Sequence, residues 1–200
     1  MRNAKYESLM SAVRVFRSEL VPSAFGPIPK SVAYLEGELD EAREKADRAA
    51  IFVLLVGECS RSCNDELYLF ALRRRAIEFS DDPISLAGLA FGIAVFRPTE
   101  KVEAADMAKK AIECARQVNR RVRYSATNAI RIGLMIDNYN LVDQALDILV
   151  SDKLNYRLED TPYEFDFIDK IDKNKCNSML LQEYRDIQHN ETNAMHRTNP

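Results

Sequence analysis

The sequence has few of the residues that interrupt helices and few of those that enzymes most often use for catalysis. Its 200 residues include six glycines, seven prolines, two histidines and no tryptophan. Both histidines, His189 and His196, lie near the C-terminus, beyond the part expected to fold, so a nucleophile paired with histidine inside the domain is not expected. The sequence also has no glycine-rich phosphate loop and no dinucleotide-binding fingerprint. We therefore expect a protein that is not an enzyme and that needs no cofactor.

Cysteine and long apolar runs are also scarce. Four cysteines are too few for a disulfide framework in a chain of this length. Cys59 and Cys63 are four residues apart, but no second cysteine or histidine pair completes a tetrahedral metal site, so no metal is expected. The first residues lack the apolar core of a signal peptide, and the most apolar run, residues 49–57, is too short to cross a bilayer. These features predict a cytoplasmic protein with no membrane partner.

The charges nearly balance, with 28 basic and 31 acidic side chains and a net charge of −3. No general attraction to nucleic acid follows from this balance, so nucleic acid is not the expected partner. Four arginines between residues 116 and 123 leave an alternative open, because a helix that continues past residue 120 would align them into a stripe. Such a stripe could bind phosphate, an acidic peptide or an RNA backbone, or it could be a solvated face paired with nearby acids such as Glu113. The alternative anion-binding residues are Arg116, Arg120, Arg121 and Arg123.

The residues that are abundant favour an all-α fold. Hydrophobic residues make up 46% of the chain, strong helix formers are common, and no segment alternates with the period of two that marks a strand. Prolines between residues 21 and 29 predict a stiff loop after the first helix. Ser31 is expected to be the N-cap of a single long helix that ends near Cys59. Apolar periodicity and cap residues predict helices over residues 5–20, 31–59, 64–79, 83–96, 100–120, 125–136 and 141–152.

Two of these predicted helices, over residues 125–152, organise the chain. Gly133 lies inside the first, where it costs about 1 kcal/mol relative to alanine, so another backbone is expected to come close. Ala145, twelve residues later in the second helix, is small enough to supply that contact. The same pair recurs upstream, because Gly92 and Ala104 each lie 41 positions earlier. A fixed period of this size indicates stacked helix pairs.

These residues resemble the tetratricopeptide repeat. That family has an apolar and a small residue in succession in the first helix of each pair, as in Phe91-Gly92 and Ile132-Gly133, and an alanine twelve residues later. The resemblance covers about residues 50–152, including a weaker third copy that starts at Gly57. It implies stacked antiparallel helix pairs forming an α-solenoid. An irregular helical bundle with glycines at the helix crossings is the alternative.

By this resemblance, the protein is expected to bind a protein or peptide partner in a groove lined by the first helix of each pair. The lysine and asparagine pair of the family's peptide-carboxylate clamp is missing, so binding of that kind is not expected. Proteins of this type commonly act as adaptors, secretion chaperones or immunity proteins, and the residues do not discriminate among these. The expected partner-binding residues are Leu86, Leu89, Ile93, Arg97, Thr127, Ile130, Arg131 and Leu134.

The C-terminal part differs in composition from the repeat-like core. Residues Thr161 to Glu164 combine an N-cap, a proline in the first turn and a capping-box glutamate, which predicts a helix start. Residues 161–187 are expected to cap the repeats, although an acidic-aromatic segment offered to a partner is the alternative. We expect one helical domain over residues 1–187, a disordered tail over 188–200, and possible self-association through exposed helix faces.

Overall fold

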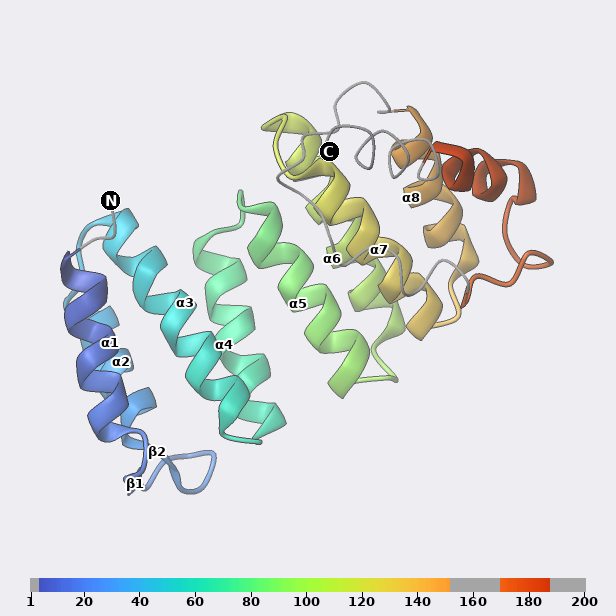
Figure 1. Ribbon diagram of the computed structural model, residues 1–200. Helices are drawn as coiled ribbons and strands as arrows, with labels where there is room; N and C mark the ends of the chain where they lie inside the picture. Colours follow the sequence, from blue (N-terminus) through green and yellow to red (C-terminus); the bar gives the residue numbers. More distant parts are fainter. Residues whose placement is uncertain (1–3, 152–169, 188–200) are drawn as a thin grey trace, which may run out of the picture. The chain divides into compact units, whose positions relative to one another are not determined.

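The computed structural model describes residues 4–151 and 170–187, and the regular secondary structure in these residues is helical apart from one short hairpin (Figure 1). The all-α prediction is confirmed. Consecutive helices pack against each other within residues 4–78 and within residues 83–151. The elements are α1 (Ala4–Phe16), β1 (Leu20–Val21), β2 (Ile28–Pro29), α2 (Lys30–Glu41), α3 (Lys45–Arg61), α4 (Asp65–Glu78), α5 (Pro83–Phe96), α6 (Lys101–Gln117), α7 (Val122–Met135) and α8 (Tyr139–Ser151).

The chain divides into two compact units, Met1–Glu78 and Phe79–Pro200. In the first unit, α2 packs on α1 and α3, α3 packs on α4, and the hairpin of β1 and β2 leads into α2. Its core includes large apolar side chains such as Val32, Leu35, Leu39, Ile51, Phe52, Leu55, Leu67, Leu69 and Leu72. The single domain expected over residues 1–187 remains a prediction.

In the second unit, α6 contacts both α5 and α7, and α7 contacts α8. The helix α5 also contacts α7, as the first helices of stacked pairs do. Small residues fill the seam along α6, because Ala104, Ala108, Ala111 and Ala115 are all buried there. Small side chains let neighbouring helices approach closely.

Three helix starts have the caps that the sequence indicates. The Asn64 side chain accepts a hydrogen bond from the Leu67 N–H at 3.0 Å, and the Asn138 side chain accepts one from Leu141 at 3.1 Å. Asp82 caps α5 by accepting bonds from the first free N–H groups of that helix. These side chains satisfy donors that have no partner within their helices, which explains why the boundaries fall where the sequence predicts.

The single long helix expected from Ser31 to Cys59 is wrong, because α2 ends at Glu41 and α3 begins at Lys45. The Arg48 guanidinium stabilises the break by donating hydrogen bonds to the main-chain oxygens of Leu39 and Ala42, at 2.6 and 3.0 Å. No glycine or proline marks this break. Folding the chain back here lets the apolar stripes of α2 and α3 pack on each other, which a continuous helix would prevent.

Gly133 makes the close approach predicted for it. A Cβ at this position would lie 2.8 Å from Val142 Cγ2 and 3.0 Å from the main-chain oxygen of Asn138. The crowding atoms belong to Val142 and Asn138, whereas the sequence pattern pointed to Ala145. The turn between α7 and α8 is tight because Asp137 has a positive φ of 55° and Asn138 N–H donates to the Gly133 oxygen.

The described part of the C-terminal region belongs to the second unit. Residues 178–187 are helical, and Ile171, Leu181 and Tyr184 are buried. The expected helix start at Thr161 and the expected tail over 188–200 lie outside the described residues.

Candidate functional site

The expected partner-binding residues of α5 lie in the core of the second unit. Leu86, Leu89 and Ile93 are buried, and Arg97 lies at the C-terminal end of α5, partly exposed, with its Nε 3.9 Å from Glu100 Oε1. Three of these four side chains therefore provide core packing and offer little surface to a partner.

The expected residues of α7 are divided between core and surface. Thr127 and Ile130 are buried, whereas Arg131 and Leu134 are partly exposed. The structure therefore brings Arg131 and Leu134 to the surface of the unit and turns Thr127 and Ile130 inward. The eight residues do not form one continuous exposed groove lining, and their role in binding remains a prediction.

The surface of α5 is formed by a different stripe. Ile84, Gly88, Phe91 and Val95 follow the four-, three- and four-residue spacing of one helical face. Ile84 and Gly88 are half-buried, while Phe91 and Val95 are 39% and 37% exposed. At about 100° per residue, this face lies nearly opposite the one expected to bind. We call these four residues the α5 stripe.

Sequence periodicity could not identify the α5 stripe. All fourteen residues from Pro83 to Phe96 are uncharged, so polar residues do not mark an outward side. A helix that is apolar all round is usually buried all round, and the exposed Phe91 and Val95 depart from that rule.

The four arginines of the anion-binding alternative do not lie along one helix. The helix α6 ends at Gln117, and α7 begins only at Val122. Arg116 and Arg120 are exposed, Arg121 has a left-handed φ of 64°, and Arg123 is buried. The stripe depended on a helix that continued past residue 120, so its geometry is not present, and anion binding remains a prediction for the individual residues.

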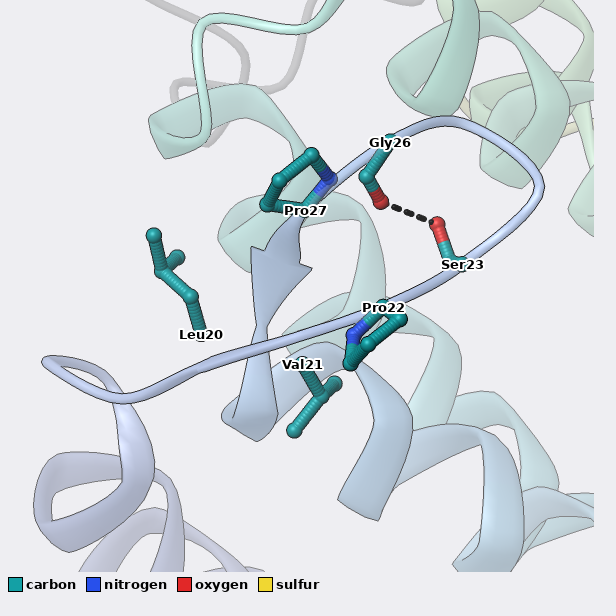
Figure 2. Close-up of a pocket in the computed structure, with 6 residues that line it drawn as sticks. All are labelled: Leu20, Val21, Pro22, Ser23, Gly26 and Pro27. Atoms are coloured by element: carbon teal, nitrogen blue, oxygen red, sulfur yellow. Dashed lines mark hydrogen bonds between the residues drawn. The ribbon is translucent and has the colours of Figure 1, made fainter.

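The hairpin forms a hollow of about 310 Å³ on the first unit (Figure 2). The Ser23 hydroxyl closes the turn beside it by donating to the Gly26 oxygen at 2.7 Å, and Gly26 has the positive φ that this turn requires. Phe25 anchors the turn to α4, because its ring lies 5.2 Å from that of Phe70. The lining residues are Leu20, Val21, Pro22, Ser23, Gly26 and Pro27.

The hairpin is poorly suited to accept a further strand. Hydrogen-bonded and non-bonded pairs alternate along an antiparallel ribbon. The pairing of Leu20 with Pro29 and of Val21 with Ile28 puts Pro22, Pro27 and Pro29 at non-bonded positions. N–H groups at these positions point outward, toward an added strand. Proline has no N–H, so the hairpin offers few donors to a peptide, and the mostly apolar lining of its hollow suits an apolar side chain.

A buried carboxylate joins α2 and α3 of the first unit to the residue that follows α1. Glu58 of α3 is 2% exposed, and its two oxygens accept hydrogen bonds from Arg17 at 2.7 and 3.0 Å. Ser31 of α2 and Arg61 of α3 donate to the same carboxylate at 2.9 and 2.8 Å. Ser31 therefore acts as a donor inside the fold and is not the helix cap that the sequence predicted.

The ionisation of Glu58 follows from this environment. Burial acts to raise the pKa of the carboxyl, but the hydrogen bonds from Arg17 and Ser31 and the positive charges of Arg17 and Arg61 outweigh it. The pKa of Glu58 therefore lies below its ordinary value, and the group is ionised at neutral pH. A carboxylate with every neighbour already engaged is a structural ion pair and a poor acid or base.

Neighbouring Cys59 has unreactive surroundings. Burial, with the negative charges of Glu36 and Glu58, raises the pKa of this thiol to about 12. Its thiolate is therefore almost absent at neutral pH, whereas nucleophilic cysteines depend on that form.

Within residues 4–151 and 170–187, no cluster of three or more histidine, cysteine, aspartate or glutamate side chains could hold a metal ion. None of the helices in that part of the chain has the length and apolarity needed to cross a membrane.

Comparisons of the chain with protein-family models, with curated proteins and with solved structures gave no match. Function is therefore inferred from the fold and its surfaces.

Proposed function

We propose that this protein is a non-enzymatic interaction module that binds another protein through the α5 stripe. The observation that carries the proposal is the exposure of Phe91 and Val95 on a helix without a charged residue. Apolar side chains that gather on one exposed face of a folded protein often mark an interaction surface. An aromatic ring such as Phe91 is also a type of residue that contributes strongly to binding.

The chemistry of the α5 stripe favours a helix as the bound element. None of Ile84, Gly88, Phe91 and Val95 has a polar side chain. An extended peptide laid on this surface would lose water from its main-chain groups and gain no hydrogen bonds in return, which costs free energy. A helix satisfies its main-chain groups internally and can present an apolar face of matching spacing.

The arrangement of the second unit supports this class of function. The pairs α5–α6 and α7–α8 each pack together, and α5 contacts α7, an arrangement similar to two stacked tetratricopeptide repeats. By that likeness, the protein would serve as an adaptor, a secretion chaperone or an immunity protein, working in the cytoplasm. The proposed binding face differs from the one that the likeness implies, because Leu86, Leu89 and Ile93 are buried.

The test uses a double substitution, Phe91→Glu with Val95→Glu, in the affinity-tagged full chain. Val102→Glu is the matched control, because Val102 lies on α6 and is 76% exposed. After circular dichroism shows that all three proteins are equally helical, proteins retained from native lysate are quantified by mass spectrometry. We expect a partner that the wild type and Val102→Glu retain and that the double variant loses by at least tenfold.

Equal retention of that partner by all three proteins would remove the α5 stripe from the interface. Retention of nothing by any of them would leave the interaction-module proposal without support.

A further inference from the structure

The helix α8 is buried over more of its circumference than one neighbouring helix covers. Its buried side chains span about half of the helix surface at 100° per residue, whereas the stripe that packs on one neighbour is typically about 100° wide. The helix α7 packs against α8 and accounts for one side. The buried residues are Leu141, Val142, Ala145, Leu146, Leu149 and Val150.

Residues 170–187 lie against the second side of α8. The main-chain N–H of Asn177 donates to Asp143 Oδ1 at 2.7 Å, and Lys175 Nζ lies 5.2 Å from the centre of the Tyr139 ring. Figure 1 shows the helix of residues 178–187 beside α8. One face of α8 contains Tyr139, Asp143, Leu146 and Val150, which are spaced four, three and four residues apart. We call these four residues the α8 stripe.

The C-terminal segment provides the apolar side chains that such a stripe needs. Ile171, Leu181 and Tyr184 are buried, while Met179, on the opposite side of the same short helix, is 81% exposed. The segment also complements the charge at the start of the stripe, because Lys175 Nζ donates to Asp137 Oδ1 at 3.1 Å. The segment is thus an amphipathic helix preceded by a basic residue.

The attachment of this segment has the features of a reversible contact. Lys175 and Asp137 are both more than half exposed, so water and salt weaken their attraction. A helix as short as residues 178–187 is not stable alone in water, so it forms when it docks and melts when it detaches. Only Ile171, Leu181 and Tyr184 are buried among the 18 residues of this segment, so its local opening should cost less free energy than unfolding of the unit.

We propose that the α8 stripe is a helix-binding face and that residues 170–187 occupy it, which makes this segment an internal competitor. The outside ligand that fits has the same chemistry: a short amphipathic helix with a leucine and an aromatic residue three positions apart and a basic residue before it. This inference is independent of the α5 stripe, and either proposal can fail without the other.

The experiment titrates a fluorescent synthetic peptide of residues 170–187 into the full chain and measures anisotropy. The test variant is Leu181→Asp with Tyr184→Asp, which removes the internal competitor. The matched control is Met179→Asp, which changes an exposed residue of the same helix. We expect the double variant to bind the peptide at least tenfold more tightly than the wild type and Met179→Asp do. A peptide with the same two aspartates should not bind.

The proposal is overturned if the double variant binds no more tightly than the wild type. It is also overturned if circular dichroism shows that the double variant has lost more helix than residues 178–187 contain, because the segment would then be part of the core. Hydrogen exchange in the unmodified protein provides a second measurement. The amides of residues 178–187 should exchange at least tenfold faster than those of α6 and α7, and equal rates would mean that the segment does not open separately.

Discussion

The two units are stabilised by different kinds of contact. In the first unit, long polar side chains cross between elements: Glu58 binds Arg17 and Ser31, and Arg48 pairs with Glu78 of α4. In the second unit, helices approach closely along small residues, as at the alanine seam of α6 and at Gly133.

This difference determines which perturbations each unit resists. A buried ion pair is sensitive to the loss of one partner, because the remaining charge loses its compensation. A seam of small residues is sensitive to added volume, because close-packed helices have no space for further atoms. The first unit should therefore respond to changes in charge and the second to changes in size.

The largest effect is expected from Glu58→Ala. This change empties a buried site and leaves the buried Ser31 hydroxyl without its acceptor, and it also removes the partner of Arg17 and Arg61. It should destabilise the first unit by about 3 kcal/mol, mostly through the cavity and the unpaired hydroxyl, because the two guanidiniums are 41% and 61% exposed. The control is Glu41→Ala, because Glu41 is an exposed carboxylate at the end of α2, where a substitution should cost less than about 0.5 kcal/mol. Urea unfolding followed by circular dichroism measures both changes.

Cysteine alkylation shows which unit has been destabilised. Cys59 is buried in the first unit and Cys114 in the second, so each reacts mainly after its own unit opens. In Glu58→Ala we expect labelling of Cys59 to accelerate by about a hundredfold, which corresponds to the loss of about 3 kcal/mol, and labelling of Cys114 to stay unchanged. Equal acceleration at both thiols would show that the two units open together.

An intermediate effect is expected from Gly133→Ala. The added methyl group meets the stiff side chain of Val142 and the main-chain oxygen of Asn138, so α7 and α8 must separate slightly. The steric strain should cost about 2 kcal/mol, which is more than the gain in helix propensity of about 1 kcal/mol, so the variant should be less stable than the wild type. Thermal unfolding with hydrogen exchange of α7 and α8 measures it.

Gly37→Ala in α2 is the matched control for this substitution. No atom lies within 4 Å of an added Cβ there, so the same change should stabilise the first unit by about 0.5–1 kcal/mol. If both substitutions change stability in the same direction, the space around Gly133 is not what limits the second unit.

The sequence predicted the features of the fold that depend on local residues. The caps Asn64, Asp82 and Asn138 satisfy donors only a few positions away, so their helix starts could be recognised. Gly133 could be recognised too, because an interior glycine that costs free energy needs a compensating contact. The break between α2 and α3 could not, since Arg48 binds carbonyls across the turn and the local residues favour helix.

The candidate site was less predictable than the fold, for a reason visible in α5. Periodicity identifies the buried side of a helix by its contrast with polar residues, and α5 has no such contrast. Leu86 and Phe91 are equally apolar, yet Leu86 is buried and Phe91 is exposed. The choice between them depends on how α6 and α7 pack, which the sequence of α5 does not encode.

The smallest effect is expected from acidification, and it should again separate the two units. In the folded chain, hydrogen bonds from Arg17 and Ser31 overcome the effect of burial to lower the pKa of Glu58, and the hydrogen bond from Arg48 lowers that of Glu78. A carboxyl whose pKa is lower in the folded state stabilises the fold above its unfolded-state pKa of about 4.3, and this contribution is lost as the pH falls through the folded-state value. Hydrogen exchange at pH 6 and pH 3, corrected for intrinsic rates, should therefore show a greater loss of protection in α1–α4 than in α5–α8.

The effect of acidification should be smaller than that of Glu58→Ala, because a protonated carboxyl still accepts hydrogen bonds. In Glu58→Ala the first unit should lose less protection on acidification, since one of its two shifted carboxyls is gone. An equal loss in both units would show that charge matters no more to the first unit than to the second.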